Sequence, residues 1–135
     1  MLLRVLKAKL HLATVTRTDL NYHGSITIDE DLMDAVGLLP FEQVLIANCT
    51  NGNRSETYVL RGPRGSGAIE LNGAMAHLAA PGDRVIIMSF AFVRRRRAAR
   101  VKPKIAILNE SNHILEQWAG DRPEDALPPE TISPQ

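Results

Sequence analysis

The chain has little of what marks secreted or membrane-spanning proteins. It has one cysteine in 135 residues, Cys49, so no intramolecular disulfide can form. Aromatic residues make up only 4% of the sequence, so aliphatic side chains must fill the core. Apolar runs such as residues 85–88 are far too short to cross a bilayer. The first residues lack the apolar segment and cleavage site of a signal peptide, and we therefore expect a cytoplasmic protein.

The formal net charge is only +1, but the charges are unevenly distributed. Residues 94–104 contain a basic cluster, whereas residues 118–135 are rich in proline and acidic side chains. We predict one domain over residues 1–117 and a disordered tail over residues 118–135. The cluster Arg94-Arg95-Arg96-Arg97 favours a solvated loop, because no aromatic residue within it can stack on a base. The alternative is a small β-barrel binding module that contacts nucleic acid or a partner through these arginines.

Short alternating segments separated by turn residues predict a mostly β domain. Asp29 is expected to cap a short helix that ends at Gly37. Many short strands with one or two short helices favour a small barrel. Cys49, which follows a hydrophobic segment, is expected to be a buried small hydrophobe. Strands are expected at residues 2–6, 9–12, 25–28, 43–48, 55–60, 68–71, 85–91 and, as the last strand, 104–108.

Two further features suggest a functional site. In Lys9-Leu10-His11-Leu12, alternation puts Lys9 and His11 on one strand face, which suits either a site or an exposed surface. Gly24-Ser25 is a bond at which a chain can cut itself: the Ser25 hydroxyl can attack the Gly24 carbonyl and convert the amide to an ester. Elimination and hydrolysis would then leave a pyruvoyl group, an electrophilic ketone within the chain. Most Gly-Ser pairs are plain turns, so this pair alone is weak evidence.

Several separated motifs occur in one order and at matching spacing. They are Lys9-Leu10-His11, Tyr22-His23-Gly24-Ser25, Thr50-Asn51-Gly52, Arg54, Thr57-Tyr58, Arg64-Gly65-Ser66 and Asn72-Gly73-Ala74-Met75-Ala76-His77. Together they resemble the pyruvoyl-dependent aspartate 1-decarboxylase family. The resemblance runs from about residue 7 to about residue 90 and continues weakly through residues 104–108.

The resemblance implies a six-stranded double-psi β-barrel with short helices that assembles as a homotetramer with active sites between subunits. It implies a lyase that decarboxylates L-aspartate to β-alanine for pantothenate and coenzyme A biosynthesis. The precursor would cleave at Gly24-Ser25, either spontaneously or with a maturation factor, and Ser25 would become a covalent pyruvoyl group. That group would form a Schiff base with the substrate amine and accept the electrons released with CO2. Neither a metal nor a membrane is expected to take part.

The resemblance also implies residue roles. Tyr58 would protonate the carbanion. Arg54 can bind one substrate carboxylate through paired hydrogen bonds, with Lys9 as a second cationic anchor. Thr57 and the backbone of Gly73, Ala74 and Met75 would contact the substrate, although Met75 replaces the small residue expected there. Asn72 would stabilise the oxyanion of cleavage or orient the substrate, and His11 and Tyr22 would support the site.

Overall fold

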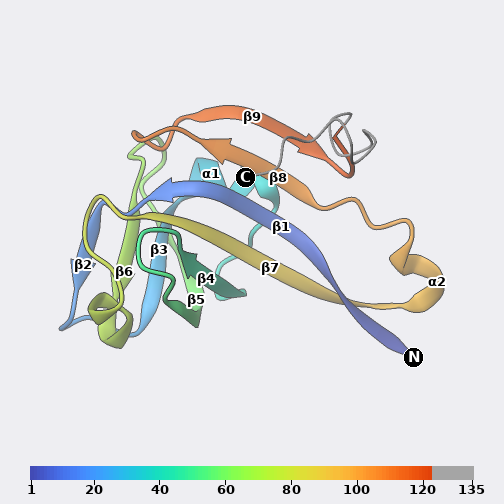
Figure 1. The fold of residues 1–135 in the computed structure, drawn as a ribbon, viewed down its shortest axis with the longest axis horizontal. Coiled ribbons are helices and arrows are strands. Elements are labelled where there is room, and N and C mark those ends of the chain that lie inside the picture. Colours follow the sequence, from blue (N-terminus) through green and yellow to red (C-terminus); the bar gives the residue numbers. More distant parts are fainter. Residues whose placement is uncertain (123–135) are drawn as a thin grey trace.

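Strands dominate the computed structural model, which describes residues 1–122 (Figure 1). The strands are β1 (Leu2–Thr14), β2 (Arg17–Asp19), β3 (Ser25–Asp29), β4 (Gln43–Asn48), β5 (Arg54–Gly62), β6 (Ile69–Asn72), β7 (Arg84–Arg94), β8 (Lys104–Leu108) and β9 (Ile114–Ala119). The helices are α1 (Glu30–Val36), α2 (Arg95–Ala98) and the 3-10 turn η1 (Gly73–His77). The prediction of a mostly β domain with short helices is confirmed. No helix among residues 1–122 is long and apolar enough to cross a membrane.

The strands pair in the order β2-β6-β3-β5-β4-β7-β1-β8-β9. Three of the pairs are parallel, namely β1 with β8, β2 with β6, and β3 with β5. The long strand β1 lies between β7 and β8, and Figure 1 shows β1 and β7 running side by side as an extended curved pair. The order places β3, which begins at Ser25, between β5 and β6.

Strand β1 replaces the two separate strands expected at residues 2–6 and 9–12. Its pairing with β7 shifts between Leu6 and Ala8 and again between Leu10 and Ala13, so the alternation of side chains is interrupted twice. Leu12 lies in the second irregularity with a φ of 63° and is half-buried, whereas Leu10 is fully buried. The alternation expected over residues 9–12 therefore does not extend to Leu12.

Three elements were not expected: β2, α2 and β9. The basic residues expected in a loop form the single turn α2, and β9 follows what was expected to be the last strand. Strand β9 also extends to Ala119, two residues into the segment expected to be the tail. Residues 123–135 of that segment lie outside the described residues.

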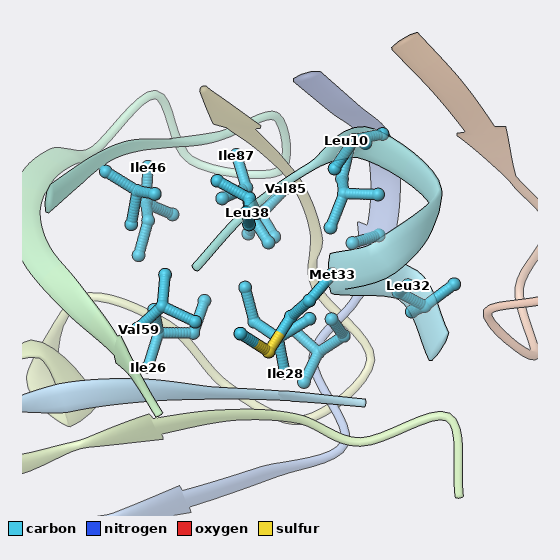
Figure 2. Close-up of a cluster of buried hydrophobic side chains, with 14 of the residues drawn as sticks. Leu10, Ile26, Ile28, Leu32, Met33, Leu38, Ile46, Val59, Val85 and Ile87 are labelled. Atoms are coloured by element: carbon cyan, nitrogen blue, oxygen red, sulfur yellow. The ribbon is translucent and has the colours of Figure 1, made fainter. Parts of the chain in front are cut away.

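Aliphatic side chains from both halves of the sheet and from α1 form the core (Figure 2). Ile26 and Ile28 of β3 are fully buried, and Met33 of α1 packs with them. As predicted, Asp29 caps α1, accepting a hydrogen bond from the Asp31 N–H at 2.8 Å. Gly37 ends the helix in the left-handed conformation, with a φ of 75°.

Cys49 is exposed, so the expectation of a buried thiol is wrong. The inward position is taken by its neighbour Asn48, which is only 4% exposed. The Asn48 amide donates to the Leu78 carbonyl and the Asp83 carboxylate, and its oxygen accepts from the Thr50 N–H. Because these bonds satisfy a buried polar group, Asn48 can end the strand on the inside and Cys49 turns outward.

Candidate active site

Ser25 is the first residue of β3 and is fully buried. It lies opposite Asn72, the last residue of the antiparallel strand β6. The Ser25 hydroxyl donates to the carbonyl of His23 at 2.9 Å. The Asn72 amide nitrogen donates to Ser25 Oγ at 3.0 Å and to Thr27 Oγ1 at 3.2 Å. The structure thus brings together Ser25 and Asn72, which the sequence placed 47 residues apart.

Gly73 packs against the backbone of Gly24, the residue before the bond expected to be cleaved. A Cβ at Gly73 would lie 2.7 Å from the Gly24 Cα, 2.8 Å from its nitrogen and 3.2 Å from the Tyr22 oxygen. The φ of Gly73 is 73°, which also disfavours a side chain. A Cβ at Gly24 itself would meet nothing within 4 Å. The close approach at this site therefore depends on the glycine at 73, and not on the one at 24 that the sequence suggested.

A cavity of about 340 Å³ adjoins this cluster, lined by Arg17, Asp19, Tyr22, Thr27, Leu60, Arg61, Glu70 and Asn72. Arg17 and Arg61 are residues that sequence reasoning missed. Arg17 lies 3.6 Å from Asp19, and Arg61 lies 3.2 Å from Glu30, so both guanidinium groups already face carboxylates. Arg17 was missed because β2 has only three residues, too few for a period to be visible.

Tyr58 lies on β5, next to β3, with Val59 paired to Ile26. Leu60 lines the cavity, and Tyr58 is two residues earlier, so both side chains share one sheet face. Tyr58 is half-buried, with its ring centroid 6.3 Å from that of Phe41. Thr57 pairs with the buried Val44, which places its side chain on the opposite face, as alternation predicted.

Lys9 and His11 occupy a different part of the sheet. They share a cavity of about 240 Å³ with Ile105, Ile107, Trp118 and Arg122. Burial, and then the charges of Lys9 and Arg84, lower the pKa of His11, which favours the neutral ring. In the sheet order β5, β4 and β7 separate β1 from β3, and neither Lys9 nor His11 lines the cavity beside Asn72. One chain therefore does not bring these two residues to Ser25.

The remaining predicted site residues lie in two places. Arg54 is exposed at the start of β5, and it lines neither of these two cavities. Ala74 and Met75 follow Gly73 in η1; Ala74 is exposed, whereas the side chain of Met75 is 8% exposed and belongs to the core. Met75 therefore offers its backbone, and not its side chain, to a site near Gly73.

Arg94 ends β7, and Arg95–Arg97 begin α2; all four are exposed. A surface hollow of about 570 Å³ lies beside these arginines and is lined by Leu2, Phe92, Val93, Arg94, Arg96 and Arg97. None of the residues around this hollow belongs to the Ser25 cluster.

Comparisons with known proteins identify a family and several relatives. The family model described as aspartate decarboxylase matches residues 1–115. The aspartate 1-decarboxylase of Shouchella clausii (strain KSM-K16) is 59% identical over 112 residues, covering 83% of this chain and 88% of that protein. The aspartate 1-decarboxylase of Bacillus subtilis (strain 168) is 56% identical over 119 residues, covering 88% and 93%.

Two solved structures of designed double-psi β-barrel proteins also resemble the chain. A computationally designed one has a TM-score of 0.42 and 18% identity, and the match covers 66% of this chain and 99% of that one. A rationally designed one has a TM-score of 0.42 and 15% identity, with coverage of 62% and 92%. On the family model and the identity to its curated relatives, the chain belongs to the aspartate decarboxylase family.

Proposed function

We propose that the protein decarboxylates L-aspartate to β-alanine and CO2, a step toward pantothenate and coenzyme A, after cutting itself between Gly24 and Ser25. Its relatives in Shouchella clausii and Bacillus subtilis are aspartate 1-decarboxylases. The observation that carries the proposal is the cluster at the start of β3. There the buried Ser25 hydroxyl is held by Asn72, and the backbone of Gly24 packs against Gly73.

Self-cleavage would proceed in three balanced steps. Ser25 Oγ bonds to the Gly24 carbonyl carbon, the C–N bond between the two residues breaks, and the hydroxyl proton passes to the released amine. Loss of the Ser25 Cα proton and cleavage of the Cβ–O bond then free Gly24 as a carboxylate and leave dehydroalanine. Addition of water and release of ammonia give the pyruvoyl group. The Asn72 N–H, which already donates to Ser25 Oγ, supports a role for Asn72 in cleavage.

The residues around Ser25 fit a covalent pyruvoyl group, since Ser25 begins a strand and is hydrogen-bonded to Asn72, which lines a cavity. Such a group supplies an electron sink for the charge left when CO2 departs. Tyr58, on the cavity face of β5, would donate the proton that the former substrate Cα needs, because its phenolic O–H is a hydrogen-bond and proton donor. Tyr22 lines the same cavity and would support it.

The substrate carboxylates require cations. Arg54 and Lys9 would bind the carboxylates, with His11 beside Lys9. Thr57 and the backbone of Gly73, Ala74 and Met75 would complete the substrate contacts. Because one chain keeps Lys9 apart from Ser25, we infer that each active site forms between subunits of a homotetramer. In that arrangement the anchors of one subunit face the Ser25 cluster of its neighbour.

Intact mass spectrometry tests the cleavage step. The purified protein should yield a 24-residue fragment and a 111-residue fragment that begins with a pyruvoyl group, out of the 135-residue chain. Ser25→Ala should remain one intact chain without decarboxylase activity, because it lacks the attacking hydroxyl. A wild-type protein that decarboxylates aspartate while remaining whole would show that the pyruvoyl mechanism is wrong.

A further inference from the structure

Thr27 stands two residues after Ser25 on β3, on the same face of the strand. Its hydroxyl accepts a hydrogen bond from the Asn72 amide nitrogen at 3.2 Å, and that same nitrogen donates to Ser25 Oγ at 3.0 Å. Ile26 and Ile28, on the opposite face, are fully buried in the core. The backbone positions of the two hydroxyls are therefore fixed by a packed strand.

We propose that Thr27 is a positioning residue for self-cleavage, acting through Asn72 on the Ser25 hydroxyl. The inference rests on the proposed self-cleavage at Gly24-Ser25. A side-chain amide carries two N–H groups in one plane and can turn about its last torsion. When Thr27 accepts from one N–H, the other is held toward Ser25 Oγ. Ser25 Oγ must accept from the Asn72 nitrogen, because the Ser25 hydroxyl proton is already donated to the His23 carbonyl.

Without the Thr27 hydroxyl, the Asn72 amide could rotate and leave Ser25 Oγ with one contact fewer. The attacking oxygen would then spend less time in the orientation that suits attack on the Gly24 carbonyl. A neutral hydrogen bond of this kind is worth about three- to tenfold in a rate that depends on it. We expect cleavage to slow by that factor and not to stop, because Thr27 does not touch the reacting atoms.

Three variants of the full chain separate the hydroxyl of Thr27 from its packing. Thr27→Val keeps the branched shape and loses the oxygen, whereas Thr27→Ser keeps the oxygen and loses the methyl group. If Thr27 acts through packing, Thr27→Val should cleave faster than Thr27→Ser. If Thr27 acts by positioning, Thr27→Ser should cleave faster. Thr18→Val on β2, which β6 separates from β3, is the matched control, because the Thr18 hydroxyl makes no hydrogen bond within residues 1–122.

The measurement is the first-order rate of cleavage of freshly synthesised precursor, followed by intact mass. We expect wild type, Thr18→Val and Thr27→Ser to cleave at similar rates and Thr27→Val to be about three- to tenfold slower. In an Asn72→Ala background, Thr27→Val should have no further effect, because the two residues act in series. Equal rates for the valine and serine variants, or an undiminished effect in the Asn72→Ala background, would overturn the proposal. A wild-type chain that never cleaves would instead contradict the proposed function itself.

Discussion

At the scale of single residues, the candidate site depends on positions where the neighbouring atoms leave no space for a larger side chain. Gly73 is the clearest case, because its missing Cβ makes room for the Gly24 backbone. The sequence predicted Gly73 as a backbone contact for the substrate. Its packing against Gly24 could not be predicted, because that contact depends on how β6 pairs with β3. Sequence patterns report which residues alternate, but not which loops approach each other.

Gly73→Ala should impair cleavage and lower stability. The added Cβ would lie 2.7 Å from backbone, and the φ of 73° adds strain of about 1–3 kcal/mol. Cleavage should slow because the Gly24 carbonyl would shift relative to Ser25 Oγ. Gly82→Ala is the control, since Gly82 also has a positive φ, 94°, but a Cβ there meets nothing within 4 Å. Chemical denaturation and intact mass check both effects; equal cleavage in the two variants would contradict the steric argument.

Tyr58→Phe should separate cleavage from turnover. Removing only the phenolic oxygen leaves Ser25, Asn72 and Gly73 in place, so the precursor should still cleave. The kcat for aspartate should fall by about 10²–10⁴-fold, the usual scale for a positioned general acid. Mass analysis establishes complete cleavage before the kinetics are measured. Full activity in the cleaved variant would assign the proton to another group.

At the scale of elements, helix α1 was predicted well because its signals are local. Asp29 lies at its start and Gly37 at its end, and the apolar stripe Leu32, Met33 and Val36 is buried as expected. The elements β2, β9 and α2 escaped prediction for the opposite reason. Strand β2 is short, and β9 is exposed at five of its six residues, so neither shows a buried period. Such strands form because a neighbouring strand offers hydrogen bonds.

Asp29→Ala should destabilise more than a helix cap alone. Besides capping α1, the Asp29 carboxylate accepts from the N–H groups of Gly65 at 3.1 Å and Gly67 at 2.8 Å. Losing the cap costs about 1 kcal/mol, and the two loop donors lose their partner as well. Urea unfolding should show a larger loss for Asp29→Ala than for Asp31→Ala, whose carboxylate is exposed and pairs with Arg64. Equal losses would mean that neither the cap nor the loop contacts of Asp29 stabilise the fold.

At the scale of the whole molecule, a half-buried ion pair links β1 to the segment that leads into β4. Lys7 donates to Glu42 at 2.7 and 2.9 Å and to the Gly37 carbonyl at 2.8 Å. Burial alone would raise the pKa of Glu42, but hydrogen bonds from Lys7, Ser89 and the Leu39 N–H outweigh it and lower that pKa. The folded protein thus favours the charged carboxylate more than the unfolded chain does.

Acid should therefore weaken the fold through Glu42. Its contribution is complete above the ordinary pKa of 4.5 and is lost as the pH falls through the lower folded value. Glu42→Gln should be less stable than wild type at neutral pH, because Lys7 loses its partner, and its stability should fall less steeply below pH 4.5. Thermal melts across this range measure both effects. Parallel curves of melting temperature against pH for wild type and Glu42→Gln would contradict this role of Glu42.

Assembly can be tested by mixing two inactive proteins. Ser25→Ala has an intact Arg54 but cannot form the pyruvoyl group, whereas Arg54→Ala can form the pyruvoyl group but lacks the arginine. If sites form between subunits, unfolding and refolding the two precursors together should restore up to about a quarter of wild-type activity, since random pairing joins the intact halves in one site of four. Each protein refolded alone is the control. No recovery in verified mixed oligomers would place Ser25 and Arg54 in one subunit's site.

Strand β1 makes the folding of the cleaved protein depend on the association of two fragments. A break after Gly24 leaves β1 and β2 joined to the rest of the protein only by non-covalent contacts, yet β1 lies between β7 and β8 and buries Ala8, Leu10 and Ala13. The 24-residue fragment should thus stay bound, but its return after unfolding becomes a bimolecular event. A precursor subunit folds at a rate independent of dilution, whereas the refolding of a mature subunit should slow as the protein is diluted. Cleavage thereby turns one folding polypeptide into a two-component complex governed by mass action.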